Sequence, residues 1–335
     1  MEYIRWGIIG CGKYVQEKSG QAFKNVGKSS VHAVMRRDIE AAKICAKKLN
    51  APKFYNDYEK LIEDKDVDAV YIASPPGLHL KQALQCAKFK KPLYIEKPMA
   101  RNFFECETIV NEFNKSGIPL YVSHYRRAHE KFQKIKSIID SCIIGKVSTV
   151  NCQLNRIFED DMDRPWHFKP SLSGGGKFVD IAPHMIDILI YLFGKIKSVK
   201  SYCVNHNDKH DLEDVVVAIF KFCTNVIGTL NFNLFSSEKN DKIICIGKEG
   251  RLEFSIHGTS PIILSKNNKI IQEIMIENPK NSQIPMVENV VKDLIEGCEN
   301  VCYGMEALET YRVIDLILDD FYKGRNRNFW KDFNG

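Results

Sequence analysis

The sequence predicts an α/β protein with two domains: an N-terminal doubly wound parallel sheet and a C-terminal α+β domain with a large, mostly antiparallel open sheet. The chain has 335 residues, which is more than one hydrophobic core usually contains. Short apolar runs alternate with amphipathic stretches up to about residue 124. Longer β-branched runs of alternating polarity follow. We therefore expect a first domain over residues 1–124 and a second over 125–335.

The N-terminal part contains candidate strands separated by stretches with apolar residues at helical spacing. The strands are expected at residues 3–9, 31–35, 53–55 (weak), 69–73, 93–96 and 120–123. Helical spacing is clearest over residues 38–49 and 79–88. Because strands that alternate with helices pair in parallel, this part predicts a parallel sheet covered by helices.

The C-terminal part begins with a predicted helix at about residues 128–141 and continues with candidate antiparallel strands. They are expected at residues 147–156, 215–222, 226–235, 242–247, 251–255 and 261–266. One helix over residues 178–193 interrupts them, and helices at about 285–298 and 305–322 close the chain. No long linker occurs, so we expect the two domains to touch and to leave a cleft between them.

The composition excludes several classes of function. The 48 basic and 42 acidic residues are spread along the chain, which disfavours a nucleic-acid surface despite the net charge of +6. The eleven cysteines include no Cys-x-x-Cys pair, so we expect reduced, mostly buried thiols. The apolar stretch 181–193 is too short to span a membrane, and no signal peptide follows Met1. We expect a soluble, cytoplasmic protein.

The first motif is Gly10-Cys11-Gly12, which directly follows a strand and precedes a helical stretch. Two glycines there permit a tight turn and let the backbone approach a pyrophosphate, which the helix N-terminus stabilises. The third glycine position of this fingerprint holds Val15, so we expect the helix to pack slightly farther from the strand. The motif predicts a Rossmann dinucleotide site that includes Gly10, Gly12, Lys13 and Tyr14; a plain strand-to-helix turn is the alternative.

The end of the second strand is basic, with Arg36 and Arg37 followed by Asp38. NAD enzymes of this kind place an acidic residue here to bind the ribose 2′-hydroxyl. Two guanidinium groups instead suit a 2′-phosphate, so the pattern favours NADP, with NAD possible. In the alternative interpretation, Asp38 caps the next helix or reaches the ribose, and the arginines are solvated.

Two further turns follow strands at the edge where a parallel sheet binds its ligand. One is Ser74-Pro75-Pro76-Gly77 with His79 close behind, and the other is Glu96-Lys97-Pro98. A lysine beside a nicotinamide stabilises a developing alkoxide and holds the substrate hydroxyl; a surface lysine at a strand end is the alternative. The residues of these turns that we expect to support the cofactor are Ser74, Pro75, His79, Glu96 and Lys97.

The glycine-rich run 174–187 contains Asp180, His184 and Asp187 at helical positions i, i+4 and i+7, hence on one face of a helix. Imidazole suits proton transfer near neutral pH, and a neighbouring carboxylate can orient it. Pro183 lacks an N–H and would kink the helix unless it lies in the first turn.

Taken together, these motifs resemble the Gfo/Idh/MocA family, named for glucose-fructose oxidoreductase and inositol dehydrogenase. The resemblance covers nearly the full chain, and only Val15 and Pro183 depart from the family's pattern within the motifs. It implies that Lys97, Asp180 and His184 line the substrate site. It further implies a cis peptide before Pro98, an open C-terminal sheet that forms homodimer or homotetramer contacts, and final helices that pack near the cofactor domain.

The predicted function is an NADP-preferring oxidoreductase that moves a hydride to or from a secondary alcohol; that the alcohol belongs to a sugar, cyclitol or related polyol is implied by the resemblance. His184 would be the general acid/base, Lys97 would polarise the substrate oxygen, and Asp180 would hold the histidine or a second hydroxyl. The further residues expected to face the substrate are His124, Arg127, Trp166 and His167.

Two other functions remain open at this point. One is a glycosidase that uses the nicotinamide transiently and restores it; the other is a regulator that binds dinucleotide and sugar only to signal. The presence of Lys97 and His184, the expected catalytic residues, disfavours the regulator. His206 and His210, with Asp208 and Asp211, resemble a metal pair but lie in a polar connector, so we interpret them as a loop and expect no metal.

Overall fold

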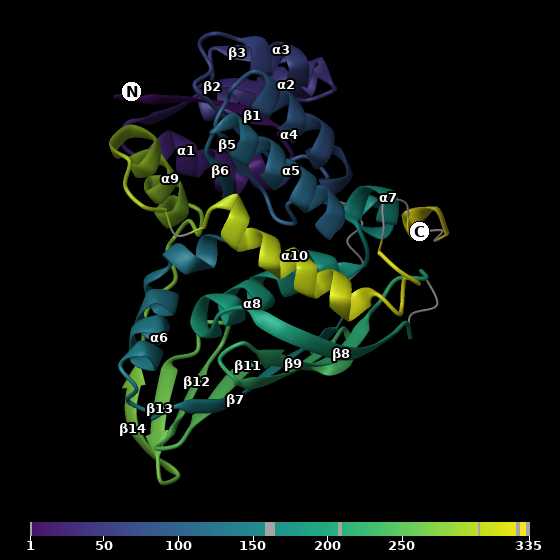
Figure 1. Ribbon diagram of the computed structural model, residues 1–335. Helices are drawn as coiled ribbons and strands as arrows, with labels where there is room; N and C mark the ends of the chain where they lie inside the picture. The colour runs from purple at the N-terminus through teal and green to yellow at the C-terminus, as the bar shows by residue number, and fades with distance from the viewer. Residues whose placement is uncertain (1, 158–164, 207–209, 301, 326–328, 333–335) are drawn as a thin grey trace. The chain divides into compact units, whose positions relative to one another are not determined.

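The computed structural model describes residues 2–157, 165–206, 210–300, 302–325 and 329–332 (Figure 1). The chain forms two compact units, and neither is a continuous piece of sequence. The first unit comprises Met1–His129 and Pro279–Leu308, and the second comprises Glu130–Asn278 and Glu309–Gly335. The domain boundary expected at residue 124 stays a prediction.

In the described part of the first unit, six strands form one sheet in the order β3-β2-β1-β4-β5-β6. All neighbouring strands are parallel, which confirms the predicted doubly wound sheet. The strand order reverses between β1 and β4, the place where open α/β sheets bind ligands. The strands are β1 Ile4–Ile9, β2 Ser29–Met35, β3 Lys53–Tyr55, β4 Ala69–Ile72, β5 Leu93–Ile95 and β6 Leu120–Val122.

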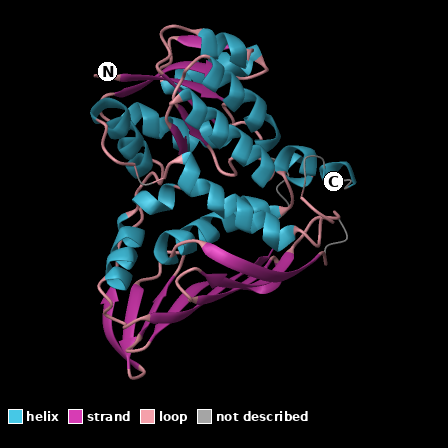
Figure 2. Ribbon diagram, in the orientation of Figure 1, coloured by secondary structure: helices cyan, strands magenta, loops and turns pink. Residues whose placement is uncertain are grey.

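A chain of aromatic rings forms the centre of the first unit's core. The ring of Phe23 lies 4.8 Å from that of Trp6 and 4.7 Å from that of Tyr71, and Tyr71 lies 5.3 Å from Tyr94. All four side chains are fully buried, so they link the strands to the helix that follows β1. The helices that cover the sheet (Figure 2) include α2 Ile39–Leu49, α3 Tyr58–Glu63, α4 His79–Lys88 and α5 Phe103–Ser116.

The segment Pro279–Leu308 returns to the first unit and adds helix α9, Ile284–Glu296. The Asp293 carboxylate of α9 accepts hydrogen bonds from the hydroxyls of Tyr121 at 2.6 Å and Tyr303 at 2.8 Å. Tyr121 lies on β6 and is fully buried. One carboxylate therefore attaches the late segment to the edge of the parallel sheet.

The second unit contains an eight-stranded sheet in its described residues, in the order β14-β13-β12-β11-β7-β10-β9-β8. Strands β7 and β10 pair in parallel, and the other neighbours are antiparallel. The predicted mostly antiparallel open sheet is confirmed. The strands are β7 Val147–Ile157, β8 Ile196–Val204, β9 Val215–Phe222, β10 Ile227–Asn233, β11 Phe235–Gly247, β12 Arg251–Phe254, β13 Ile262–Lys266 and β14 Lys269–Ile274.

The two edge strands, β8 and β14, are absent from the sequence-based prediction. In β8 only Ile196 is buried, and in β14 every residue is at least partly exposed. Apolar and polar residues do not alternate along either sequence, so neither segment shows the pattern of a half-buried strand. The strand expected over 226–235 ends at Asn233, and β11 begins at Phe235 although it was expected only from residue 242.

Helix α8, Lys177–Phe193, lies on one face of the second sheet (Figure 1). Its Phe178 ring lies 5.1 Å from that of Phe232 on β10, and the burial of these rings anchors the helix. Pro183 lies inside α8, beyond the first turn, and the helix continues to Phe193. The other helices of this unit are α6 Glu130–Asp140, α7 Pro170–Ser173 and the part of α10 (Gly304–Leu318) from residue 309.

No disulfide joins the cysteines of the described residues. All eleven lie in the described residues, and seven are buried. Among the residues that the structure describes, no helix has both the length and the apolar character needed to span a bilayer.

The attachment of α9 gives a testable prediction about stability. Asp293→Ala should lower the free energy of unfolding by about 1–3 kcal/mol, because the buried Tyr121 hydroxyl loses its acceptor and stays desolvated. Urea denaturation measures this change. The matched control is Asp140→Ala on α6, which removes an exposed carboxylate that is paired with Lys136 of the same helix α6. That change should cost less than about 1 kcal/mol. Equal losses would contradict the assigned contact.

Candidate functional site

The turn after β1 depends on Gly10, whose φ is +95°. A Cβ atom at this position would lie 2.4 Å from the backbone nitrogen of Ser74, so only glycine fits between β1 and β4. The N–H groups of Gly10 and Cys11 donate to the Met35 carbonyl at 3.1 and 3.4 Å. Gly12 differs, since a Cβ there would meet no described atom within 4 Å. Its missing side chain leaves open space over the turn.

Lys13 and Tyr14 begin the helix after this turn, and both side chains are exposed. The N–H of Gln16 donates to the Gly12 carbonyl at 3.1 Å, which starts the helical hydrogen bonding. The N–H groups of the first turn before Gln16 have no acceptor within the helix. Such N–H groups can bind an anion, and their contact with a pyrophosphate stays a prediction.

Val15 at the third fingerprint position is accommodated by a wider helical turn. Residues Val15–Ser19 are π-helical, and α-helix α1 follows over Gly20–Asn25. A Cβ at Gly20 would lie 2.5 Å from the Val15 carbonyl and 2.9 Å from the Leu49 side chain on α2. The close packing that usually needs a small residue at position 15 therefore occurs at Gly20.

The residues after β2 comprise a helix-capping aspartate and two exposed arginines. The Asp38 Oδ1 atom accepts the N–H groups of Glu40 at 3.0 Å and Ala41 at 3.2 Å, so Asp38 caps α2, as one interpretation of the sequence held. The side chains of Arg36 and Arg37 are exposed at the end of β2, next to the turn after β1. The structure thus combines the cap with two guanidinium groups at the ligand-binding edge.

His79 connects two turns of the first unit. Its ring nitrogens lie 2.7 Å from the Ser74 carbonyl and 3.1 Å from the Met99 carbonyl, and its side chain is buried. Burial lowers the pKa of His79 to about 4, so the neutral ring donates to one carbonyl at a time. Ser74 donates to the Gln82 side chain at 2.6 Å, and Pro75 precedes the short helix Pro76–Leu78. Direct cofactor contacts of these residues stay a prediction.

Glu96 is a buried carboxylate directly before Lys97, and the peptide between Lys97 and Pro98 is cis, as the resemblance implied. Glu96 accepts hydrogen bonds from the Tyr71 hydroxyl at 2.5 Å, the Ser123 hydroxyl at 3.1 Å and the Lys97 N–H at 3.2 Å. Burial raises the pKa of Glu96, although these donors oppose the shift. The carboxylate fixes the backbone that carries Lys97.

Gln283, which the sequence analysis did not identify, completes this network from the N-terminus of α9. Its Nε2 lies 2.9 Å from both the Tyr14 hydroxyl and Glu96 Oε1, and its Oε1 accepts the Tyr94 hydroxyl at 2.9 Å. The side chain is fully buried. A glutamine 187 residues from its partner carries no local sequence signal, so only the fold reveals the contact.

His124 and Arg127 lie just beyond β6, around the short helix Tyr125–Ala128. Both side chains are buried in the first unit, and the Arg127 N–H donates to the His124 carbonyl at 3.1 Å. Their predicted contact with a substrate stays a prediction.

In the second unit, Glu213 holds the glycine run before α8. Both oxygens of its buried carboxylate lie 2.9 Å from the N–H of Gly176, and the Tyr322 hydroxyl donates to one of them. A Cβ at Gly176 would lie 2.8 Å from Glu213, so the close approach requires glycine. Burial raises the pKa of Glu213. This carboxylate, which was not identified from the sequence, fixes the start of α8.

The polar face of α8 carries the three predicted residues. Asp180 is half-buried, and His184 and Asp187 are buried. Asp187 accepts the Thr310 hydroxyl of α10 at 3.4 Å, so its carboxylate contacts a neighbouring helix. The His184 ring lies 5.8 Å from the ring of His257, nearly perpendicular to it. His257 was not identified from the sequence.

Trp166 and His167 lie in the short helix Pro165–Phe168, and their ring centroids are 3.9 Å apart. The buried His167 accepts a hydrogen bond at Nδ1 from the Lys177 ammonium at 2.6 Å. His167 therefore connects this segment to the first residue of α8. Substrate contacts of Trp166 and His167 stay a prediction.

Two family models match this chain. Residues 4–124 match the oxidoreductase family with an NAD-binding Rossmann fold, and residues 132–260 match the GFO/IDH/MocA C-terminal domain. The chain belongs to the Gfo/Idh/MocA family. It is an oxidoreductase with an NAD-binding fold, which confirms the resemblance drawn from the motifs.

Two relatives and one solved structure are similar to this chain. Oxidoreductase P35 of Formosa agariphila is 34% identical over 317 residues, which cover 93% of this chain and 98% of that protein. Myo-inositol 2-dehydrogenase of Thermotoga maritima is 26% identical over 257 residues, 74% of each protein. A solved structure of levoglucosan dehydrogenase, with NADH and levoglucosan bound, matches with a TM-score of 0.87 at 18% identity, covering 96% of this chain and 97% of that one. The last likeness concerns the fold alone.

The metal-like histidine pair of this Gfo/Idh/MocA protein has other contacts. His206 is exposed and its ring stacks on Phe235 at 5.5 Å, whereas the His210 ring stacks on Phe168 at 5.4 Å. Asp208 lies outside the described residues. In the described residues, ligand atoms of His32, Asp64 and Asp66 lie within 4.8 Å of one another. The Lys53 ammonium occupies that cluster, at 3.0 and 2.8 Å from the two carboxylates.

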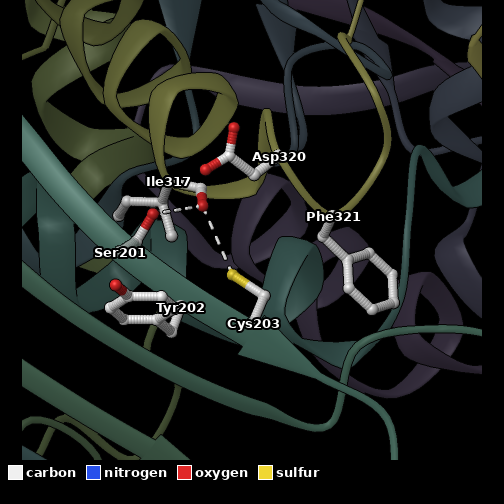
Figure 3. Close-up of a pocket in the computed structure, with 6 residues that line it drawn as sticks. All are labelled: Ser201, Tyr202, Cys203, Ile317, Asp320 and Phe321. Carbon is white, nitrogen blue, oxygen red and sulfur yellow. Dashed lines mark hydrogen bonds between the residues drawn. The ribbon is translucent and has the colours of Figure 1, made fainter.

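The second unit of this family member contains a cavity of about 150 Å³, and none of the predicted site residues lines it (Figure 3). The Ile317 carbonyl accepts hydrogen bonds from Ser201 Oγ at 2.6 Å and Cys203 Sγ at 3.3 Å. Burial raises the pKa of Cys203 to about 12, which leaves it protonated. These contacts hold the end of α10 on β8. The lining residues are Ser201, Tyr202, Cys203, Ile317, Asp320 and Phe321.

The two glycines of the first turn give opposite predictions. Gly12→Ala should leave the melting temperature unchanged, because its Cβ enters open space. It should weaken dinucleotide binding by about tenfold or more, which is about 1.4 kcal/mol, since the Cβ obstructs the approach of the pyrophosphate.

Gly10→Ala is the matched comparison, and it should destabilise the fold by about 2 kcal/mol or more because of its positive φ and the clash with Ser74. Thermal unfolding and calorimetric titration with NAD and NADP measure both effects. Unchanged affinity in Gly12→Ala would contradict the assigned pyrophosphate site.

Proposed function

We propose that this oxidoreductase moves a hydride between a bound nicotinamide and a secondary alcohol or ketone carbon of a sugar, cyclitol or related polyol, with a preference for NADP(H). The observation that carries the proposal is the position of Lys97. It lies just beyond the end of β5, after Glu96, and the dinucleotide turn follows β1 of the same parallel sheet, so both occupy the same edge.

Lys97 is proposed to polarise the substrate oxygen and to stabilise the alkoxide that develops during oxidation. The buried Glu96 supports this role, because it accepts the Lys97 N–H at 3.2 Å and fixes the backbone there. His184 is proposed as the general acid/base, and Asp180, one helical turn earlier, would orient the imidazole or bind a second hydroxyl. The cofactor supplies the hydride chemistry when it is bound.

The preference for NADP is proposed from the end of β2. Arg36 and Arg37 are exposed there, and guanidinium groups bind phosphates through paired hydrogen bonds. The Asp38 carboxylate, which would have to bind the ribose hydroxyl in an NAD enzyme, caps α2 through Oδ1.

The proposed substrate class is supported by the family members compared above. One acts on myo-inositol by its name, and another holds levoglucosan in its structure. A homodimer or homotetramer through the open sheet is also proposed. Support comes from β9, where Val217 and Ile219 are exposed and alternate with buried residues.

The first test is nicotinamide absorbance with a panel of polyols and oxidised sugars, using NADP and NAD. Lys97→Ala should lower kcat/KM by roughly 10²–10³-fold with the best substrate, because a stabilising charge at the reacting oxygen is lost. Lys88→Ala, an exposed lysine in the same unit, is the control. Full activity in Lys97→Ala would reject the site. Release of an aglycone without net cofactor turnover would instead identify the glycosidase, and binding without turnover the regulator.

The second test concerns the cofactor. Arg36→Ala and Arg37→Ala should each lower the ratio of kcat/KM with NADP to that with NAD by roughly 10–100-fold, since a charge-assisted hydrogen bond is worth about 1.5–3 kcal/mol. Lys47→Ala, an exposed position on α2, should leave the ratio unchanged. A wild-type enzyme that favours NAD would overturn the NADP assignment.

A further inference from the structure

A carboxylate fixes the loop between β12 and β13 in the second unit. Asp241 on β11 accepts three consecutive backbone N–H groups of this loop. The donors are Ile256 at 3.0 Å, His257 at 2.6 Å and Gly258 at 2.7 Å. An anion that accepts three successive N–H groups holds a short segment in one backbone conformation.

A buried ammonium group also contacts this loop, through a hydroxyl and two carbonyl oxygens of the loop. Lys131 lies at the start of α6 and only 3% of it is exposed. Its Nζ donates to Ser255 Oγ at 3.0 Å, the Ser260 carbonyl at 3.1 Å and the Gly258 carbonyl at 3.4 Å. Because a buried ammonium is costly unless its protons are used, Lys131 is committed to this loop.

The residue that these contacts position is His257. Its imidazole lies against His184 of α8, with 5.8 Å between the ring centroids and 77° between the ring planes. His184 is buried and His257 is half-buried. Two charged side chains thus determine where the His257 backbone lies, and the His257 ring lies edge-to-face against His184.

This contact restricts the orientation of the His184 ring, which the helix backbone leaves variable. The last side-chain torsion of histidine has a broad energy minimum, so the helix backbone alone does not fix the plane of the ring. A general acid/base must present one ring nitrogen to the substrate within narrow limits of distance and angle. An edge-to-face neighbour restricts that torsion.

We infer that His257 is a positioning residue for His184: its ring, held by Asp241 and Lys131, sets the plane in which the His184 imidazole meets the substrate hydroxyl. The inference rests on the proposed function for the role of His184. In this inference His257 acts by packing. Substitution by another aromatic residue should therefore preserve its effect on His184, and substitution by a hydrogen-bonding residue without a ring should not.

The kinetic test compares three substitutions with the best substrate of the polyol panel. His257→Ala should lower kcat by roughly 10–100-fold, the loss expected when a reacting group is displaced by about 1 Å, with KM and the melting temperature little changed. His257→Phe should restore kcat to within about threefold of wild type. His257→Gln should remain as slow as His257→Ala.

The control is His206→Ala, which removes another histidine with an aromatic neighbour in the same unit and should leave kcat unchanged. Recovery of kcat by glutamine and not by phenylalanine overturns the inference, because His257 then acts through a hydrogen bond. Wild-type kcat in His257→Ala overturns it as well.

Asp241→Asn tests whether the loop acts through His257. An amide nitrogen in place of one carboxylate oxygen faces an N–H donor, so this variant should release the loop and lower kcat. If Asp241 affects kcat only through His257, the double variant Asp241→Asn/His257→Ala should lose no more kcat than His257→Ala alone. Losses that multiply in the double variant contradict the inference.

A measurement without turnover separates this inference from the proposed function. NMR of ¹³C-labelled histidine, with the His184 signal assigned by His184→Gln, should show one narrow resonance in wild type and in His257→Phe. The resonance should shift and broaden in His257→Ala. An unchanged resonance in His257→Ala overturns the inference, whereas failure of every polyol in the assay rejects the proposed function and leaves this readout valid.

Discussion

Glu96 and Glu213 are buried carboxylates, one in each unit, and each accepts a backbone N–H from the segment that carries a family motif. A buried carboxylate is tolerated only when donors replace the water that it has lost. These donors include the Lys97 N–H in the first unit and the Gly176 N–H in the second. The need to satisfy these charges therefore fixes the backbone where Lys97 begins its turn and where α8 starts. Asp241 acts in the same way on the loop after β12, although it is only half-buried.

The glycines of the motifs follow from these constraints in different ways. Gly10 is required by its positive φ and by the nearby backbone of β4, and Gly176 by the carboxylate of Glu213. Gly12 meets no such obstacle within the described chain. A glycine that the protein itself does not require is the one whose open space is available to another molecule. The motif Gly10-Cys11-Gly12 thus combines a glycine that the fold requires with one that the described chain does not require.

Features encoded by short-range pattern were predictable from the sequence, and features that depend on long-range packing were not. The parallel sheet and α8 follow from apolar periodicity and from turns at fixed places, such as the one at Gly10. The edge strands β8 and β14 bury few side chains, and apolar and polar residues do not alternate along their sequences. Gln283 and His257 lie far along the chain from Glu96 and His184, so their contacts exist only once the fold brings them together. The sequence predicted a helix over residues 178–193, but only the structure shows that this helix continues through Pro183.

The interleaving of the two units along the chain has a consequence for biosynthesis. The first unit receives α9 only after all the strands of the second have been made, and the second receives its last helical segment later still. A nascent chain that emerges N-terminus first therefore exposes the edge at β6, where Asp293 will attach, throughout the synthesis of some 150 intervening residues. The last segments of the two units follow one another in the sequence, and one cut cannot separate the units into two intact proteins.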